Sequence, residues 1–400
     1  MELDETVTSR RSGPLRVVIC GTTFGQVYLE AFRVQRLDLE LAGILGRGSE
    51  RSRSCSEFYG VPLFTRAADL PANIDVACVI VRSSLLGGEG TELARELMSR
   101  GIHVLQEHPL HHDELAECLR EAHRCRVHYR LNSFYPYLSP VERFVSTARQ
   151  LLVRRRALYI DAACSFQVCY ALFDILWTIL GRVKPSSWTS VSSVRGKDSQ
   201  PEAAPVFRSA DGVFAGVPLS LRIQNQVDPS DPDNGAHLLQ RITLGTDAGE
   251  LTLVTTHGPV VWSARPAIPR EVRDSDPTQL FGRVAITNDD VCTALMAQGE
   301  QASQRHVFRH LWPAAAGRAM VEFGQAIQGE ENSLAMAQHH LALCRVWQDL
   351  ARELGPPELV QSQLGGSGLS PEELAAMRDA AGETGAGSPN LESTAKQVNR

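Results

Sequence analysis

Short apolar runs alternate with segments of helical period between residues 15 and 136, and this alternation constrains the fold more than any other feature of the chain. Leu15–Cys20 is apolar and rich in β-branched residues, which is typical of a buried parallel strand. The five further runs that we expect to form strands are 40–45, 61–64, 75–81, 103–105 and 127–132. Strands joined by helices over short loops predict an α/β domain with a doubly wound parallel sheet, which binds its ligand at the carboxyl ends of the strands.

The pattern changes after residue 150. Leu158–Phe166 predicts a strand and Val168–Leu180 an apolar helix, and the alternation of apolar and polar residues over 219–224 predicts a strand with one face exposed. Glycine-containing segments at 245–249 and 257–258 predict hairpin turns. The helices expected to cover the sheet are 291–310, 312–328 and 333–354. We therefore predict a C-terminal α+β domain with a mostly antiparallel sheet.

Charge and cysteine content exclude several classes of protein. With 40 basic and 46 acidic residues the net charge is -6, so the chain lacks the broad positive field that binding to nucleic acid or to a membrane surface needs. Nine cysteines occur without a Cys-x-x-Cys pair, which indicates free thiols in a reducing compartment. The polar start is no secretory signal, and no apolar run is long enough to span a membrane. We expect a cytoplasmic protein.

The turn after the first strand contains Gly21 and Gly25. Glycines at this point let backbone N–H groups approach a pyrophosphate, which then lies at the positive end of the following helix. Thr23 stands where a dinucleotide-binding fingerprint has its second glycine, and the third glycine is missing. We predict that Gly21, Thr23, Phe24 and Gly25 bind a dinucleotide in a Rossmann domain. A tight turn without a nucleotide is the alternative.

The end of the second strand indicates which dinucleotide is bound. Enzymes that use NAD normally carry a carboxylate there, which bonds the ribose 2′-hydroxyl. This chain instead has Arg47, Ser49, Arg51 and Ser52, whose guanidinium and hydroxyl groups suit a 2′-phosphate. The sequence therefore predicts NADPH. The alternative is that Ser49 only caps a helix and the arginines face water.

Two residues that can carry a proton lie at neighbouring strand ends. His108 precedes a proline, which restricts it to extended backbone, and Tyr135 follows the sixth strand and also precedes a proline. His108 can donate a proton near neutral pH, and Tyr135 can donate a hydrogen bond or relay a proton. Either residue alone could be structural, but together they indicate catalysis. His111 and His112 extend the cluster without the carboxylate or cysteine spacing of a metal site, so we expect no metal.

Asp174 lies within the apolar helix predicted at 168–180. A carboxylate in such a helix needs a partner. Asp174 either faces the ligand crevice or forms hydrogen bonds within the interface between the domains, and the sequence leaves both readings open.

Five motifs together resemble the thiazolinyl imine reductases of pyochelin and yersiniabactin biosynthesis. They are Gly21–Gly25, Gly48–Ser52, Val81–Ser83 with Gly87–Gly88, Gln106–His111 and Asn132–Pro136. The resemblance runs from about residue 15 to residue 355. These enzymes belong to the wider glucose–fructose oxidoreductase and inositol dehydrogenase family, most of which has Glu-Lys-Pro where this chain has Glu107-His108-Pro109. The missing lysine argues against alcohol oxidation and sugar substrates.

The resemblance implies NADPH-dependent reduction of a thiazoline C=N bond to a thiazolidine, on a siderophore precursor tethered to a carrier domain of a nonribosomal peptide synthetase. It implies His108 and Tyr135 as the acids, Arg82, Ser83 and Glu107 as further cofactor-binding residues, and a homodimer. An NADP-dependent sugar or cyclitol dehydrogenase is an alternative, as is a noncatalytic regulator that senses dinucleotides. The polar segment 194–211 is expected to border the substrate channel.

Taken together, the sequence predicts four segments. They are a disordered arm at 1–14, a dinucleotide-binding Rossmann domain at 15–136, a substrate and oligomerisation domain at 137–355, and a largely disordered tail at 356–400 that contains a short helix at 371–381.

Overall fold

The structure is a computed structural model, and it describes residues 13–35, 37–83, 88–191, 205–231, 235–266, 292–297, 303–329, 333–361 and 369–384. Most of the predicted arm and much of the predicted tail lie outside these residues. The chain divides into two compact units, Met1–Val227 with Ala236–Glu358 and Asp228–Gly235 with Leu359–Arg400. Among its described residues the second unit has the helix α11 (Pro371–Thr384), where the sequence predicts a helix.

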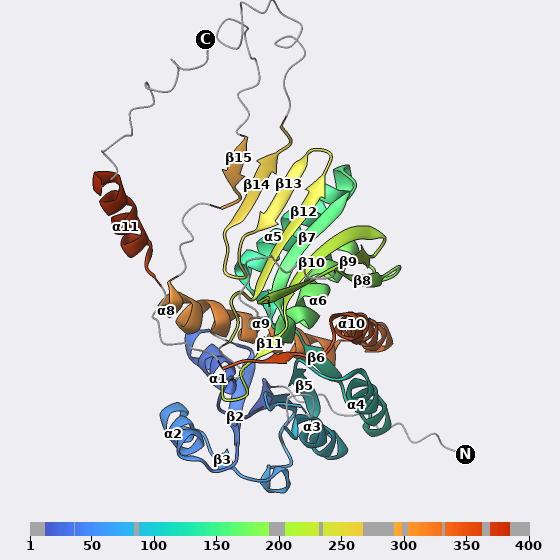
Figure 1. The fold of residues 1–400 in the computed structure, drawn as a ribbon. Coiled ribbons are helices and arrows are strands. Elements are labelled where there is room, and N and C mark those ends of the chain that lie inside the picture. The colour runs from blue at the N-terminus through green and yellow to red at the C-terminus, as the bar shows by residue number, and fades with distance from the viewer. Residues whose placement is uncertain are drawn as a thin grey trace, which may run out of the picture. The chain divides into compact units, whose positions relative to one another are not determined.

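The first part of the larger unit is a six-stranded parallel sheet (Figure 1). Its strands are β1 (Leu15–Cys20), β2 (Leu39–Leu45), β3 (Leu63–Phe64), β4 (Val76–Val79), β5 (His103–Glu107) and β6 (Tyr129–Asn132). The order β3-β2-β1-β4-β5-β6 reverses direction between β1 and β4, which places the ligand crevice of a doubly wound sheet at that point. The predicted Rossmann fold is confirmed.

Helices connect these strands, and several of them begin at a glycine or directly after a capping side chain. They are α1 (Gly25–Val34), α2 (Glu50–Tyr59), the 3₁₀ turn η1 (Ala67–Asp69), α3 (Gly90–Ser99) and α4 (His112–Cys125). The side chain of Ser49 caps α2, and Gly60 ends it with φ 66°. A capping box of His111 and Glu114 starts α4. The strands between them are mainly apolar, although β5 and β6 also carry polar residues, and every residue of β4 is buried.

The second part of the larger unit is an eight-stranded sheet in the order β15-β14-β13-β12-β7-β10-β9-β8. Its strands are β7 (Tyr159–Ser165), β8 (Ser187–Val191), β9 (Phe207–Phe214), β10 (Val217–Gln224), β12 (Gln240–Thr246), β13 (Gly249–Leu253), β14 (Val260–Ala264) and β15 (Thr293–Leu295). Neighbours are antiparallel except β7 and β10, which are parallel. Leu219, Leu221 and Ile223 of β10 are buried while Ser220 and Arg222 are exposed, as the alternation predicts. Gln224, which the alternation places on the exposed face, is buried instead, and its Oε1 accepts a hydrogen bond from the backbone N–H of His237. Short strands β11 (Gln226–Val227) and β16 (Glu358–Leu359) lie outside this sheet.

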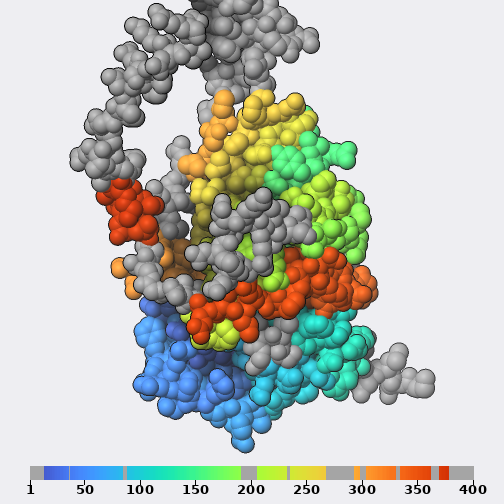
Figure 2. All heavy atoms as spheres, viewed as in Figure 1, coloured from blue at the N-terminus to red at the C-terminus, as the bar shows by residue number. Residues whose placement is uncertain are grey.

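Helices join the two sheets. They are η3 (Tyr135–Tyr137), α5 (Ser139–Arg154), η4 (Phe166–Val168), α6 (Cys169–Leu180), α8 (Gln304–His306), the π-helical turn η6 (Val307–Leu311), α9 (Trp312–Gln328) and α10 (Ser333–Leu354). Helix α9 packs on α1 so closely that a Cβ atom on Gly317 would lie 2.4 Å from Oε1 of Gln35. Helix α10 contacts α4 and α6, and Figure 2 shows it, in orange-red, between the blue-to-teal residues of the Rossmann part and the green residues of the second sheet.

One predicted helix, 291–310, is wrong in its first part, whereas residues 304–310 are helical. Residues 293–295, expected within a helix spanning 291–310, form β15 at the edge of the second sheet and pair with β14. The backbone N–H of Met296 donates to Val260 and that of Ala264 donates to Cys292, so the open edge of β14 supplies hydrogen bonds that outweigh a local helical preference. Residues 298–302 lie outside the described residues.

Candidate functional site

The turn between β1 and α1 has no room for a side chain at its first glycine. Gly21 has φ +98°, and a Cβ atom there would lie 2.5 Å from the carbonyl oxygen of Ile80, just beyond β4. Helix α1 starts at Gly25 without an acidic residue in its first turn, and no side chain of the described residues caps it. Its positive end is therefore available to an anion, and the turn fits the pyrophosphate of a dinucleotide.

The residues expected to bind a 2′-phosphate occupy the end of β2 and the start of α2. Arg47, Ser49 and Arg51 are exposed there, and Nη1 of Arg51 donates a 3.1 Å hydrogen bond to Oγ1 of Thr23 in the glycine turn. Ser49 also caps α2, accepting from the backbone N–H of Ser52 at 3.3 Å. Ser52 itself is buried, and its hydroxyl donates to the Ser49 carbonyl at 2.8 Å. The arginines and Ser49 are thus accessible, whereas the hydroxyl of Ser52 is used within the helix.

The segment after β4 lies beside the Glu-His-Pro motif. Arg82 is exposed, whereas Ser83 is buried and its hydroxyl donates to the Pro109 carbonyl at 2.8 Å. Gly87, another residue of the resemblance motifs, lies outside the described residues. Ser83 therefore supports the backbone next to His108.

At the end of β5, Glu107 and His108 form a hydrogen-bonded pair. Nδ1 of His108 lies 2.7 Å from Oε1 of Glu107 and 3.1 Å from the carbonyl oxygen of Asn132. Both neighbours only accept hydrogen bonds, so Nδ1 carries a proton and donates it. No described residue forms a hydrogen bond with Nε2, which leaves this nitrogen for proton transfer. The side chain of His108 is 6% exposed.

Two residues that the sequence does not mark as functional complete the surroundings of Glu107. The Tyr28 hydroxyl donates to Oε2 of Glu107, and Nδ2 of Asn132 lies 3.3 Å from the same oxygen and 2.6 Å from the Tyr28 hydroxyl. Tyr28 is buried on α1, the helix that starts at the glycine turn. Both carboxylate oxygens of Glu107 are therefore occupied, and the structure places Glu107 as the partner of His108. Asn132 is part of a resemblance motif, but Tyr28 has no signal beyond its place on an apolar helix face.

Tyr135 lies next to His108, at the start of η3. The two ring centroids are 5.9 Å apart with the rings nearly perpendicular, and Tyr170 of α6 stacks on His108 at 5.9 Å. Burial and then the negative charge of Glu107 raise the pKa of Tyr135, so its phenol stays protonated at neutral pH. The structure thus brings the two predicted acids together at adjacent strand ends.

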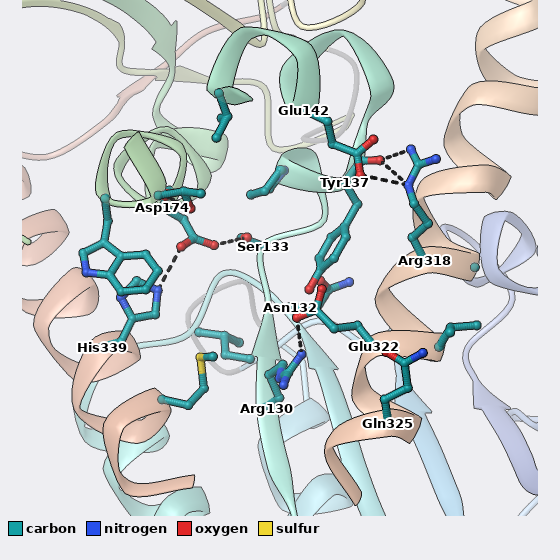
Figure 3. Close-up of a pocket in the computed structure, with 18 of the residues that line it drawn as sticks. Arg130, Asn132, Ser133, Tyr137, Glu142, Asp174, Arg318, Glu322, Gln325 and His339 are labelled. Atoms are coloured by element: carbon teal, nitrogen blue, oxygen red, sulfur yellow. Dashed lines mark hydrogen bonds and ion pairs between the residues drawn. The ribbon is translucent and has the colours of Figure 1, made fainter. Parts of the chain in front are cut away.

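Asp174 accepts hydrogen bonds from α10 and from the residue that follows β6. Its carboxylate accepts from the hydroxyl of Ser133 and from Nε2 of His339 at 2.9 Å (Figure 3). It lines a cavity of about 940 Å³ between β6, α5, α6, α9 and α10, whose lining does not include His108 or Tyr135. Of the two readings that the sequence left open, the structure shows hydrogen bonding at the interface.

The described residues contain neither a metal-binding cluster nor a membrane-spanning helix. No group of three or more histidine, cysteine, aspartate or glutamate side chains among them is placed to hold a metal ion. None of their helices combines the length and the apolar character needed to cross a bilayer.

Two protein-family models match parts of the chain. Residues 15–132 match the model of the oxidoreductase family with an NAD-binding Rossmann fold, which covers the glycine turn and the Glu107–His108 pair. Residues 15–132 are therefore similar to the Rossmann domain of this oxidoreductase family. Residues 155–263 match the model described as the C-terminal domain of Irp3-like thiazolinyl imine reductases. Both matches agree with the resemblance that the motifs indicate, and together they support an NAD(P)-dependent oxidoreductase.

Solved structures of this family share the fold at low sequence identity. An oxidoreductase from Agrobacterium radiobacter, in complex with NAD+, L-tartaric acid and magnesium, is 10% identical with a TM-score of 0.60, over 85% of this chain and 96% of that one. A dehydrogenase from Chromobacterium violaceum is 14% identical with a TM-score of 0.59, over 94% and 100%. Biliverdin reductase from Synechocystis sp. PCC 6803, in complex with biliverdin and NADP+, is 15% identical with a TM-score of 0.54, over 85% and 99%. No curated protein sequence matches the chain.

Proposed function

We propose that this oxidoreductase uses NADPH to reduce the C=N bond of a thiazoline ring to a thiazolidine, on a siderophore intermediate tethered to a carrier domain of a nonribosomal peptide synthetase. The observation that carries the proposal is the Glu107–His108 pair, with Nδ1 engaged and Nε2 left for proton transfer beside Tyr135. A family model of thiazolinyl imine reductases over 155–263 supports the substrate class. A homodimer is part of the proposal by resemblance alone, and a cytoplasmic location is part of it because the cysteine pattern indicates a reducing compartment.

Reduction of an imine needs a hydride at carbon and a proton at nitrogen, and NADPH bound at the glycine turn supplies the hydride. His108 is the better proton source of the two candidates. Its Nδ1–H is held by Glu107, so a proton on Nε2 can pass to the substrate nitrogen, while the Glu107 carboxylate balances the charge of the doubly protonated ring. Tyr135, with its raised pKa, is a poor acid and acts as a neutral hydrogen-bond donor that orients the ring.

Cofactor choice rests on the residues at the end of β2. Arg47, Ser49 and Arg51 are exposed around the place where the ribose of a dinucleotide lies in this fold, and no carboxylate occurs between Gly46 and Ser49. Arg51 reaches Thr23, so one side chain joins the ribose end of the site to the pyrophosphate turn. We propose that these three side chains bind the 2′-phosphate.

The test follows the loss of NADPH absorbance with a thiazolinyl thioester on its carrier domain, and confirms by mass spectrometry that the product has gained two hydrogens. We expect consumption that depends on the substrate, and we expect His108→Asn to lower kcat by about 10²- to 10⁴-fold, the usual loss on removing a general acid. Affinity for NADPH should not change. His112→Asn is the matched control, because His112 contacts only Asp113 among the hydrogen bonds of the described residues.

Three results would contradict the proposal. The first is a failure of every authentic thiazolinyl thioester to support NADPH consumption. The second is NADP+ reduction that depends on a polyol, which would favour a sugar or cyclitol dehydrogenase. The third is full retention of function in His108→Asn combined with Tyr135→Phe while cofactor still binds, which would favour a regulator.

A further inference from the structure

The backbone that carries Tyr135 makes an uncommon turn. Phe134 has φ 61° and ψ -56°, and the N–H of Tyr135 donates to the Ser133 carbonyl at 2.7 Å. This is a γ-turn with a positive central φ, a rare and strained conformation that a bulky residue such as phenylalanine seldom adopts. It lies between the last residue of β6 and η3, so it sets the direction in which Tyr135 leaves the sheet.

A strained turn persists only where its surroundings hold it. The ring of Phe134 is fully buried, 5.2 Å from Phe24 and 5.8 Å from Trp312 between ring centroids. The N–H of Phe134 donates to Oδ1 of Asn132 at 3.1 Å. These contacts hold the middle of the turn. Its first residue, Ser133, is held by a different group.

That group is Asp174 on α6 (Figure 3). Burial alone would raise the pKa of Asp174, but the hydrogen bond and charge of His339 and the hydrogen bond from Ser133 outweigh it, and the pKa is lowered. The carboxylate is therefore ionised and accepts the Ser133 hydroxyl. His339 is itself fixed, because its ring lies 3.7 Å from that of Trp177.

Helix α6 contacts His108 directly and reaches Tyr135 through Ser133. Tyr170, four residues before Asp174, stacks on His108, while Asp174 contacts Ser133 two residues before Tyr135. Residues four apart lie on the same face of a helix, so one rigid face of α6 sets the position of both.

We propose that Asp174 is a positioning residue, which acts through Ser133 to clamp the γ-turn and so aims Tyr135 at His108. This rests on the proposed function, because aiming matters only if the pair works on a substrate. The clamp itself is a structural property that can be measured without a substrate.

The first readout is hydrogen–deuterium exchange of the Phe134 and Tyr135 amides, whose acceptors are Oδ1 of Asn132 and the carbonyl oxygen of Ser133. We expect Ser133→Ala to speed their exchange by about 10-fold, the effect of opening the turn more easily. Asp174→Asn keeps an oxygen for Ser133 but loses the charge, so it should give a smaller increase. Thr178→Val is the matched control: Thr178 lines the same cavity on α6, and its hydroxyl donates to the backbone carbonyl of Asp174.

The second readout separates positioning from a general loss of structure. In Ser133→Ala we expect kcat with the thiazolinyl thioester to fall about 10- to 100-fold, as small misplacements of a catalytic group do, with KM for NADPH unchanged. Ser133→Thr, which restores the hydroxyl, should recover most of the rate. Thr178→Val should keep the wild-type kcat.

The outcomes are distinguishable. Unchanged amide exchange in both Ser133→Ala and Asp174→Asn would overturn the clamp. Faster exchange with a normal kcat would overturn the positioning role. If the wild-type protein reduces no thiazolinyl substrate, the proposed function fails, while the exchange data still decide whether Asp174 holds the turn.

Discussion

Glu107 holds His108 in one tautomer, because its carboxylate and the Asn132 carbonyl both face Nδ1. The sequence marks Glu107 as a cofactor-binding residue, yet both of its oxygens are used by protein side chains. Single residues thus divide into exposed ones that we propose bind the cofactor, such as Arg51, and those that support a neighbouring residue, such as Glu107 and Ser83.

The proposed preference for NADPH can be tested at Arg51. We expect Arg51→Ala to raise KM for NADPH about 10-fold while KM for NADH stays unchanged, because only the former has a phosphate for the guanidinium, and a charge-assisted hydrogen bond of about 1.5–3 kcal/mol is lost. Initial rates with each cofactor check this. Arg95→Ala is the control, since Arg95 is paired with Glu117 on the other side of the Rossmann domain. Equal effects on both cofactors would show that Arg51 does not bind the 2′-phosphate.

At the scale of elements, short turns decide where the functional groups lie. The glycine turn after β1 brings α1 against the sheet, and α1 carries Tyr28 to Glu107. The γ-turn after β6 aims Tyr135. Strand and helix positions follow from apolar periodicity, but a γ-turn centred on phenylalanine has no local signal, because it exists only where buried partners hold it.

Substitution of Gly21 tests the glycine turn. We expect Gly21→Ala to cost more than about 1–3 kcal/mol, because alanine at φ +98° is strained and its Cβ atom would lie 2.5 Å from the Ile80 carbonyl oxygen. Thermal unfolding should show a lower Tm, and NADPH titration a loss of affinity. Gly101→Ala is the control: its φ is +80° but no atom lies within 4 Å of the added carbon, so it reports the backbone cost alone. Equal losses for the two variants would contradict the close approach.

At the scale of the whole molecule, residues far apart in sequence meet in buried polar clusters. Tyr170 bonds Nδ1 of His340 at 2.7 Å, and Asp174 bonds His339, so α6 and α10 share a polar interface inside an apolar core. Burial first, and then the neighbouring charges of His339 and Arg130, lower the pKa of His340 to about 3. His340 is therefore neutral in the folded protein.

This interface makes stability depend on pH. An unfolded histidine binds a proton below about pH 6.5, whereas folded His340 does not until about pH 3, so stability is full above pH 6.5 and falls as the pH drops between these values. His340 contributes up to about 1.4 kcal/mol per pH unit to this fall. Urea unfolding at a series of pH values should show it, and His340→Asn should reduce the slope. His103, whose pKa burial lowers to about 4, contributes to the slope that remains.

His123→Asn serves as the control for that experiment, since His123 is exposed on α4 and should not alter the slope. A His340→Asn protein with the wild-type pH dependence of stability would show that His340 does not stay neutral in the folded state.

The sequence by itself determined the parallel sheet, the glycine turn and the strand-end positions of His108 and Tyr135, because each depends on periodicity or on neighbouring residues. Only the tertiary structure decided which side chains form hydrogen bonds with one another in the buried clusters. Tyr28 meets Glu107 across 79 residues, and Asp174 meets His339 across 165. Strand β15 arose likewise from a free sheet edge that a local helical pattern does not reveal. Such contacts depend on how elements pack, since the packing removes water and leaves each buried polar group to bond with whichever group lies opposite.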